Sequence, residues 1–187
     1  MDIPSVKGYG NFDVEPFEAY LSRWPRETYP YFPVCLIEHW VYRHWQDFSA
    51  YWIAAGALEW SYKQLPFTNE EVATICTFKK MMETMKFWGD ELFRDRLRQK
   101  SWLADYMLRE GTTPVPILVF ENGANFPHPF GNNGETMCTP YQLIEGHMRT
   151  SYLWGMHRES HVALKSKHQV WRSEERRVGK ECRSRWS

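Results

Sequence analysis

A short segment, Glu145-Gly-His-Met-Arg149, contains the residue types best suited to chemistry in this chain. It follows a strand-like run, Tyr141 to Ile144, and precedes a helix-like run, so it forms a corner between the two. Glycine permits positive φ and close backbone approach at such a corner, and the N–H groups of the following helix attract anions. Arginine adds a planar fork that matches phosphate oxygens. The segment therefore predicts a site for a nucleotide or another phosphate-bearing small molecule, bound by Gly146, His147, Arg149 and Thr150.

Two residues of this corner are candidates for catalysis. His147 suits general acid/base chemistry near neutral pH, or it only hydrogen-bonds the corner. Glu145 suits a Mg²⁺ ion that arrives with a nucleoside triphosphate, because Mg²⁺ is commonly held by one or two carboxylates. A structural alternative stays open, in which the corner is a tight turn whose Arg149 caps a neighbouring element.

The end of the chain differs in character from the rest. Residues 172–187 have no apolar periodicity and resemble the in-frame translation of a short-read sequencing adapter. We expect a non-native segment there; the alternative is a natural basic tail that binds nucleic acid. The segment holds six of the 23 Lys and Arg and three of the 23 Asp and Glu, so the remaining residues have 17 bases, 20 acids and a formal charge of −3. We also expect the native product to continue beyond Trp171.

Composition narrows the class of protein. Mild acidity argues against a protein that coats nucleic acid, since affinity for phosphate comes mainly from clustered Lys and Arg. The cysteines before the tail, Cys35, Cys76 and Cys138, are widely spaced and form no C-x-x-C pair, so neither a zinc knuckle nor a disulfide framework is indicated. Cys138 lacks a nearby base in sequence and is not expected to be a nucleophile. With no secretory signal and no long apolar run, we expect a cytoplasmic protein without a membrane partner.

The first hundred residues divide into an irregular segment and a helical region. Residues 1–32 are rich in Pro, Gly and aromatic residues, with a short helix expected from Pro16 to Trp24. Residues 33–100 form the helical region, in which Ile37 to Trp52 shows helical spacing. Thr68-Asn-Glu-Glu71 is a capping-box pattern that predicts the start of a second long helix, running to Met85.

The hydrophobic period changes after Gly111, which predicts the end of a third helical stretch that begins near Asp90. Residues 113–120 form a continuous apolar run, typical of a buried strand. A long loop then reaches the strand and helix around the corner, and His168 to Trp171 predicts the start of a last strand. The chain is therefore predicted to be α+β, with an N-terminal helical region and a mixed α/β domain at residues 101–171.

The order of these elements resembles the ParB/sulfiredoxin-like superfamily. Its ParB-type members have a helix, a Gly turn, a "Pro-Ile-x-Val" strand and a "Leu-Ile-x-Gly-x-x-Arg" corner, which match Gly111, Pro116–Val119 and Leu143–Arg149 here. The resemblance implies nucleotide-phosphate binding by Gly146 and Arg149, with His147 between them, and phosphoryl transfer or hydrolysis in some members. This chain departs from the family pattern at two positions. His147 occupies the position of the reactive Cys of sulfiredoxins, and Met148 occupies the position of the first of two consecutive Arg residues in partition proteins.

Two other functions remain open at this point. One is a non-enzymatic interaction module of a phage or mobile element, in which the aromatic-rich helices of residues 33–62 bind a protein partner. The other is a DNA-binding or nuclease protein, against which the acidity counts.

Overall fold

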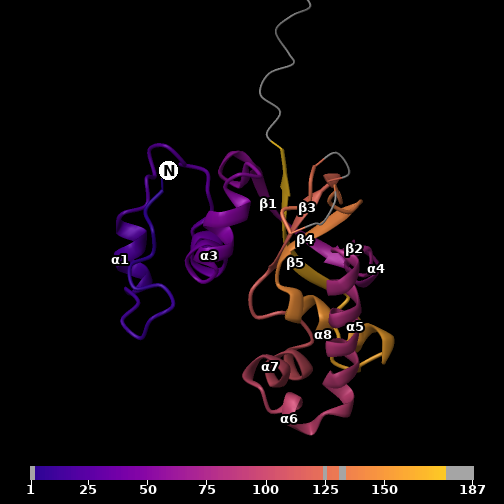
Figure 1. Ribbon diagram of the computed structural model, residues 1–187. Coiled ribbons are helices and arrows are strands. Elements are labelled where there is room, and N and C mark those ends of the chain that lie inside the picture. The colour runs from indigo at the N-terminus through magenta and orange to yellow at the C-terminus, as the bar shows by residue number, and fades with distance from the viewer. Residues whose placement is uncertain (1–2, 124–125, 131–133, 176–187) are drawn as a thin grey trace, which may run out of the picture. The chain divides into compact units, whose positions relative to one another are not determined.

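A computed structural model describes residues 3–123, 126–130 and 134–175 of the chain (Figure 1). The chain divides into two compact units. The first comprises the residues up to Tyr62 and those from Glu174 on, and the second comprises Lys63–Ser173. Helices predominate in the first unit and a five-stranded mixed sheet lies in the second, so the predicted α+β class is confirmed.

Short helices build the first unit. The helix predicted near Pro16 is confirmed as α1, but the segment from Pro33 to Trp52 is a series of short helical turns, not one regular helix. Its apolar residues are nevertheless buried as the helical spacing predicts, among them Ile37, Trp40 and Phe48. The helices of this unit are α1 (Phe17–Ser22), α2 (Val34–Leu36), the π-helix η1 (Ile37–Tyr42), α3 (Trp45–Asp47), the π-helix η2 (Phe48–Trp52) and the 3₁₀ turn η3 (Ala57–Glu59).

The second unit is a mixed sheet with helices packed on it. The strand order is β1-β5-β3-β4-β2. β3 is antiparallel to β4 and parallel to β5, and β2 is parallel to β4. The strands are β1 (Ser61–Thr68), β2 (Ile75–Cys76), β3 (Ile117–Glu121), β4 (Tyr141–Glu145) and β5 (Lys167–Glu174), and the helices are α4 (Asn69–Ala73), α5 (Lys79–Arg94), α6 (Arg96–Gln99), α7 (Trp102–Glu110) and α8 (His147–Arg158).

The prediction of a wholly helical region at residues 33–100 is wrong, because the strands β1 and β2 lie within it. The capping box of Thr68 and Glu71 is present, with reciprocal bonds of 3.3 Å and 2.7 Å, but it opens only the short helix α4. β2 separates α4 from α5, because Ile75 and Cys76 pair with the edge of β4. β1 contains Pro66, which a sheet tolerates on an edge strand, and β1 is an edge strand.

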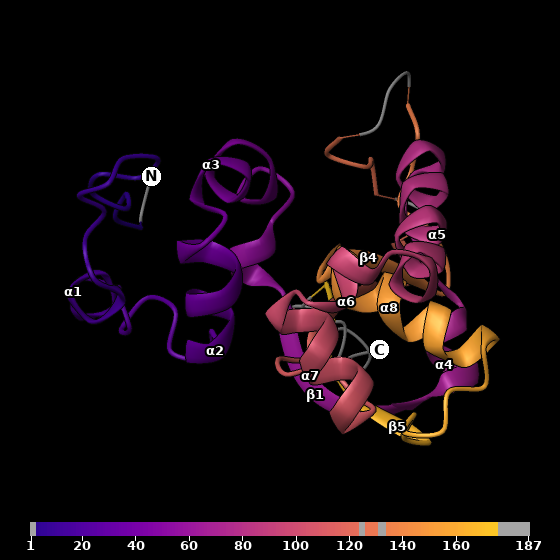
Figure 2. The same ribbon diagram turned by 90° about the horizontal axis from the view of Figure 1, so that it is seen from below.

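The core of the second unit lies between the sheet and the helices. β3 is the central strand, and its residues Ile117 to Phe120 are buried on both faces. α8 contacts β3, and α5 packs along α8 (Figure 2). The buried side chains that form this core include Met85, Leu92, Ala104, Met107, Ile117, Val119, Leu143, Leu153, Met156 and Val170.

The last strand crosses the predicted boundary at residue 172. Arg172 and Ser173 pair with Val119 and Phe120 of β3, and the Ser173 hydroxyl donates to Val119 O at 2.9 Å. Residues 172–174 thus belong to β5, whatever their origin, and residues 176–187 lie outside the described residues.

One buried histidine makes the stability of this unit depend on pH. His168 is 1% exposed, with Nε2 2.9 Å from Asn69 Oδ1 and Nδ1 2.9 Å from Thr112 Oγ1. Burial lowers the pKa of His168 to about 4, against about 6.5 in an unfolded chain. The unfolded state therefore binds the proton first, and the contribution to stability is lost as pH falls from about 6.5 towards 4.

We expect the free energy of unfolding to fall by about 2 kcal/mol between pH 6.5 and pH 5 through this residue. Urea titrations at a series of pH values measure how steeply the free energy of unfolding changes with pH. The His168→Gln variant should show a weaker pH dependence, and a pH dependence as steep as that of the parent would contradict the role of His168. His128, whose pKa burial also lowers, contributes to whatever pH dependence remains in the variant.

Candidate functional site

The corner predicted from the sequence has the expected backbone. β4 ends at Glu145, Gly146 takes a left-handed conformation with φ of 100°, and α8 begins at His147. A Cβ on Gly146 would lie 2.7 Å from Cγ2 of Ile117 on β3. Glycine is therefore required here both for its φ and for the close approach of the turn to the central strand.

Arg149 bonds to the protein itself. Its Nη1 donates to Val115 O at 2.8 Å and to Pro116 O at 3.2 Å, and its Nη2 forms an ion pair with Glu145. The two charged side chains are only 11% and 17% exposed. The guanidinium thus links α8 to the segment before β3 and to the end of β4. This is the role expected if the corner is a tight turn whose Arg149 caps a neighbouring element.

The other two predicted residues of the corner have different environments. His147 is half-buried at the first position of α8, and its carbonyl accepts the Ser151 hydroxyl at 2.7 Å. Thr150 is fully buried, and its N–H donates to Gly146 O at 2.8 Å. The structure therefore brings Glu145 and Arg149 together and leaves His147 near the surface, while Thr150 lies in the interior. In the part of the chain that the structure describes, no group of three His, Cys, Asp or Glu residues could hold a metal ion.

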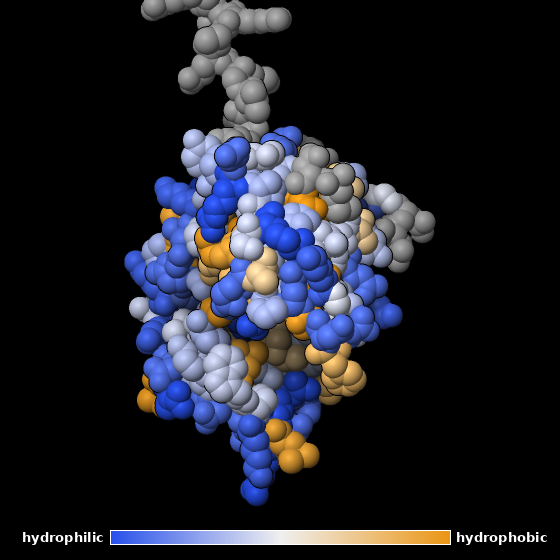
Figure 3. Space-filling view, turned by 90° about the vertical axis from the view of Figure 1, so that its left-hand side faces the viewer, coloured by the Kyte–Doolittle hydropathy of each residue, from blue (hydrophilic) through white to orange (hydrophobic). Residues whose placement is uncertain are grey.

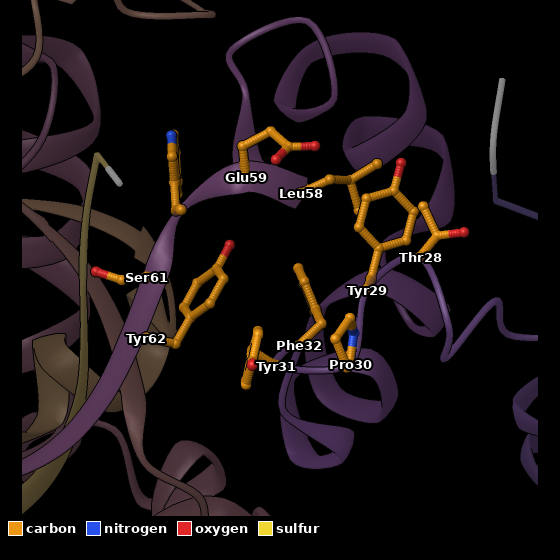
Figure 4. Close-up of a pocket in the computed structure, with 10 residues that line it drawn as sticks. Thr28, Tyr29, Pro30, Tyr31, Phe32, Leu58, Glu59, Ser61 and Tyr62 are labelled. Carbon is orange, nitrogen blue, oxygen red and sulfur yellow. The ribbon is translucent and has the colours of Figure 1, made fainter. Parts of the chain in front are cut away.

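An aromatic hollow in the first unit has more of the character of a binding site. It has a volume of about 220 Å³, and two segments face each other across it (Figure 4). One segment is irregular and the other leads from η3 into β1. The residues that line this aromatic hollow are Thr28, Tyr29, Pro30, Tyr31, Phe32, Leu58, Glu59, Trp60, Ser61 and Tyr62.

The walls of the aromatic hollow belong to the packed core of the first unit. The Phe32 and Tyr62 rings meet edge to face at a centroid distance of 5.0 Å, and Trp60 stacks on Trp40 at 6.4 Å. Such pairs favour defined ring orientations. Phe32 and Trp60 are buried, whereas Tyr31 is 76% exposed at the rim. The hollow is therefore a preformed feature, and Tyr31 is the most exposed of its aromatic side chains.

Polar groups of the aromatic hollow are few. Burial raises the pKa of Tyr62 well above its usual range, and its hydroxyl donates to Ala57 O at 2.5 Å, so Tyr62 stays neutral and fixed. Glu59 is exposed and supplies the only carboxylate among the lining residues. Among the described residues, Glu59 has no basic partner within ion-pair distance. The hollow is thus aromatic with a single negative charge.

Two further hollows lie in the second unit. One, of about 190 Å³, is lined by residues of α4, α5 and α8, including Trp154 and Lys86. The other, of about 350 Å³, is lined by Lys79, Glu135 and neighbouring residues. None of these three hollows is lined by a residue of the corner, 145–150.

The face of the molecule shown in Figure 3 offers no broad apolar interface among its described residues. The face in Figure 3 is mainly hydrophilic, and its hydrophobic residues form small separate groups, which is usual for a protein surface. Aromatic residues of the helices predicted to bind a partner, such as Trp40, Phe48 and Trp52, are buried, and Tyr51 is an exception at 41% exposure. No described helix combines the length and the hydrophobicity needed to cross a membrane.

Sequence reasoning missed the aromatic hollow because its two walls lie about thirty residues apart in the chain, in segments without regular periodicity. The signal available was the density of aromatic residues in Tyr29–Phe32 and Trp60–Tyr62. Comparison with models of protein families, with curated proteins and with solved structures finds no match to this chain.

Proposed function

We propose that the first unit is a recognition module that binds an ammonium group on an apolar stem, as in a lysine side chain or its methylated forms, in the aromatic hollow. The supporting observation is the combination of aromatic walls with the single carboxylate of Glu59. A cation over an aromatic face gains about 0.5–2 kcal/mol, more as it loses water. The carboxylate adds a Coulomb attraction that salt weakens.

The size of the hollow sets the class of ligand. Sites for drug-sized molecules and cofactors commonly exceed about 300 Å³, whereas the aromatic hollow has about 220 Å³. A whole nucleotide would not be enclosed, but one side chain of a partner protein fits this scale. The proposal is therefore binding without catalysis, with a dissociation constant on the order of 100 μM for a short peptide.

The matched test uses one peptide with its central lysine unmodified, trimethylated or acetylated. Binding of the trimethylated and unmodified forms and loss of binding on acetylation are expected, because acetylation removes the charge. Isothermal titration calorimetry on the full chain measures the affinities. Preference for the acetylated peptide would contradict the proposal.

Variants at the rim test the same site without disturbing the core. Tyr31→Ala should weaken binding about tenfold through loss of a cation–π face, while Tyr31→Phe should keep most of the affinity. Glu59→Gln should weaken binding and reduce its salt dependence. Tyr51→Ala is the matched control, an exposed tyrosine of the same unit outside the hollow, and it should bind as the parent does.

A phosphate ligand at residues 145–150 stays a prediction from the sequence. For Arg149 to hold a phosphate, the ligand would have to replace Glu145 as the partner of Nη2. A Mg²⁺–triphosphate complex would then bring its own metal, with Glu145 as the nearest carboxylate of the corner.

A further inference from the structure

Two cysteines far apart in the sequence meet at one edge of the sheet in the second unit. Cys76 lies on β2, opposite Gln142 of β4, and Cys138 lies shortly before β4. Gln142 holds both segments, because its Oε1 accepts the Cys138 N–H at 3.0 Å and its Nε2 donates to Thr77 Oγ1 at 3.2 Å. The backbone around the two thiols is therefore fixed by a buried side chain.

The two thiols are close neighbours, because each sulfur lies against the carbonyl of the residue that follows the other cysteine. Cys138 Sγ lies 3.5 Å from Thr77 O, and Cys76 Sγ lies 3.9 Å from Thr139 O and 3.5 Å from Tyr141 O. Both cysteines are free and partly exposed. A disulfide requires sulfurs about 2.05 Å apart and Cβ atoms about 3.8 Å apart, so adjacent thiols on fixed backbone need only a local adjustment.

The interaction between the two neighbouring thiols makes their pKa values unequal. Donation from the Cys76 thiol lowers the pKa of Cys138, while burial and the charge of Glu135 act in the opposite direction. The same bond, with burial, raises the pKa of Cys76. A thiolate is the reactive form of cysteine. Cys138, which the sequence alone did not indicate as a nucleophile, is therefore assigned the attacking role, and Cys76 the resolving one.

We propose that Cys76 and Cys138 form a reversible dithiol–disulfide couple that exchanges with low-molecular-weight disulfides. The Cys138 thiolate attacks one sulfur of a disulfide RS–SR, forms a mixed disulfide and releases RS⁻, which takes up a proton. Cys76 then loses its proton, attacks the Cys138 sulfur and releases the second RS⁻. The products are the Cys76–Cys138 disulfide and two RSH, so the two thiols of the protein are oxidised and the small disulfide is reduced.

The test treats the folded chain with oxidised glutathione and maps the products by mass spectrometry of tryptic peptides. A Cys76–Cys138 cross-link without glutathione is expected, along with a Tm higher by roughly 10 °C, because the bond closes a long loop. Dithiothreitol should reverse both changes. Stable glutathione adducts on both cysteines without a cross-link would overturn the proposal, as would no reaction at either cysteine under conditions in which unfolded protein reacts.

Single variants test the order of attack. Cys76→Ser should stop the reaction at a glutathione adduct on Cys138, and Cys138→Ser should leave Cys76 at least tenfold slower to react. Cys35→Ser is the matched control, a partly exposed cysteine of the first unit, and it should leave the cross-link unchanged. Equal adduct rates at Cys76 and Cys138 in the two variants would contradict the assigned roles.

Discussion

The Arg149→Ala variant is expected to lose about 3–5 kcal/mol of folding stability, because it breaks a largely buried ion pair by removing one partner. Glu145 would lose its guanidinium partner at 17% exposure. The carbonyls of Val115 and Pro116 would lose their donor at the start of β3. Urea unfolding followed by circular dichroism measures the loss.

A double-mutant cycle separates this structural role from ligand binding. Glu145→Gln alone keeps a hydrogen-bonding side chain and should cost less than Arg149→Ala. The double variant should be more stable than the sum of the two losses predicts, by at least about 1 kcal/mol, since the two side chains interact directly. Additive losses would show that the ion pair has no structural role.

The same variants also address the phosphate prediction for the corner. If a nucleotide replaces Glu145 on Arg149, Glu145→Gln should bind a fluorescent CTP, ATP or GTP analogue more tightly than the parent, with Mg²⁺ present. Absence of binding by both proteins at millimolar nucleotide would leave Arg149 with its structural role alone.

The Gly155→Leu variant is expected to unfold the second unit or to lose at least about 4 kcal/mol of folding stability. Losses this large arise from a short list of causes, one of which is overpacking of the core. α5 and α8 cross at a pair of glycines, Gly89 and Gly155. A Cβ on Gly155 would lie 2.4 Å from Gly89 O, and a Cβ on Gly89 would lie 2.5 Å from Ser151 O. Both neighbours are backbone atoms of regular helices, so neither can rotate away.

Gly155→Ala provides a stringent version of this experiment. Alanine is the better helix former by about 1 kcal/mol, so local propensity alone predicts stabilisation, whereas the helix crossing predicts destabilisation by roughly 2 kcal/mol. Glu83→Ala, at an exposed position of α5, is the control and should change stability by less than about 0.5 kcal/mol. A stabilised Gly155→Ala protein would contradict the close crossing.

Local signals of the sequence predicted local structure. The capping box at Thr68 and the end of α7 at Gly111 were both predicted and are confirmed. Each depends on a side chain and the backbone within a few residues of it, so neighbouring residues contain the information. β2 was missed for the opposite reason, since its two residues are a strand only because β4 lies beside them.

The candidate site shows the same limit. The turn at Gly146 could be predicted, but the partners of Arg149 include two carbonyls more than thirty residues away, which no local pattern encodes. The aromatic hollow and the Cys76–Cys138 pair also join segments that are distant in the chain. In both cases the sequence shows the residue types, and only the fold shows that they meet.

The most direct measurement of the proposed function is methyl NMR of the full chain titrated with choline and with its neutral isostere, 3,3-dimethylbutanol. Leu58 lines the aromatic hollow, and Leu143 in the core of the second unit serves as an internal reference. The proposal predicts that choline shifts the Leu58 methyl signals in a saturable way, while the alcohol has a much weaker effect and Leu143 does not move. Equal shifts with the two compounds, or none at Leu58, would contradict recognition of a cation by the aromatic hollow.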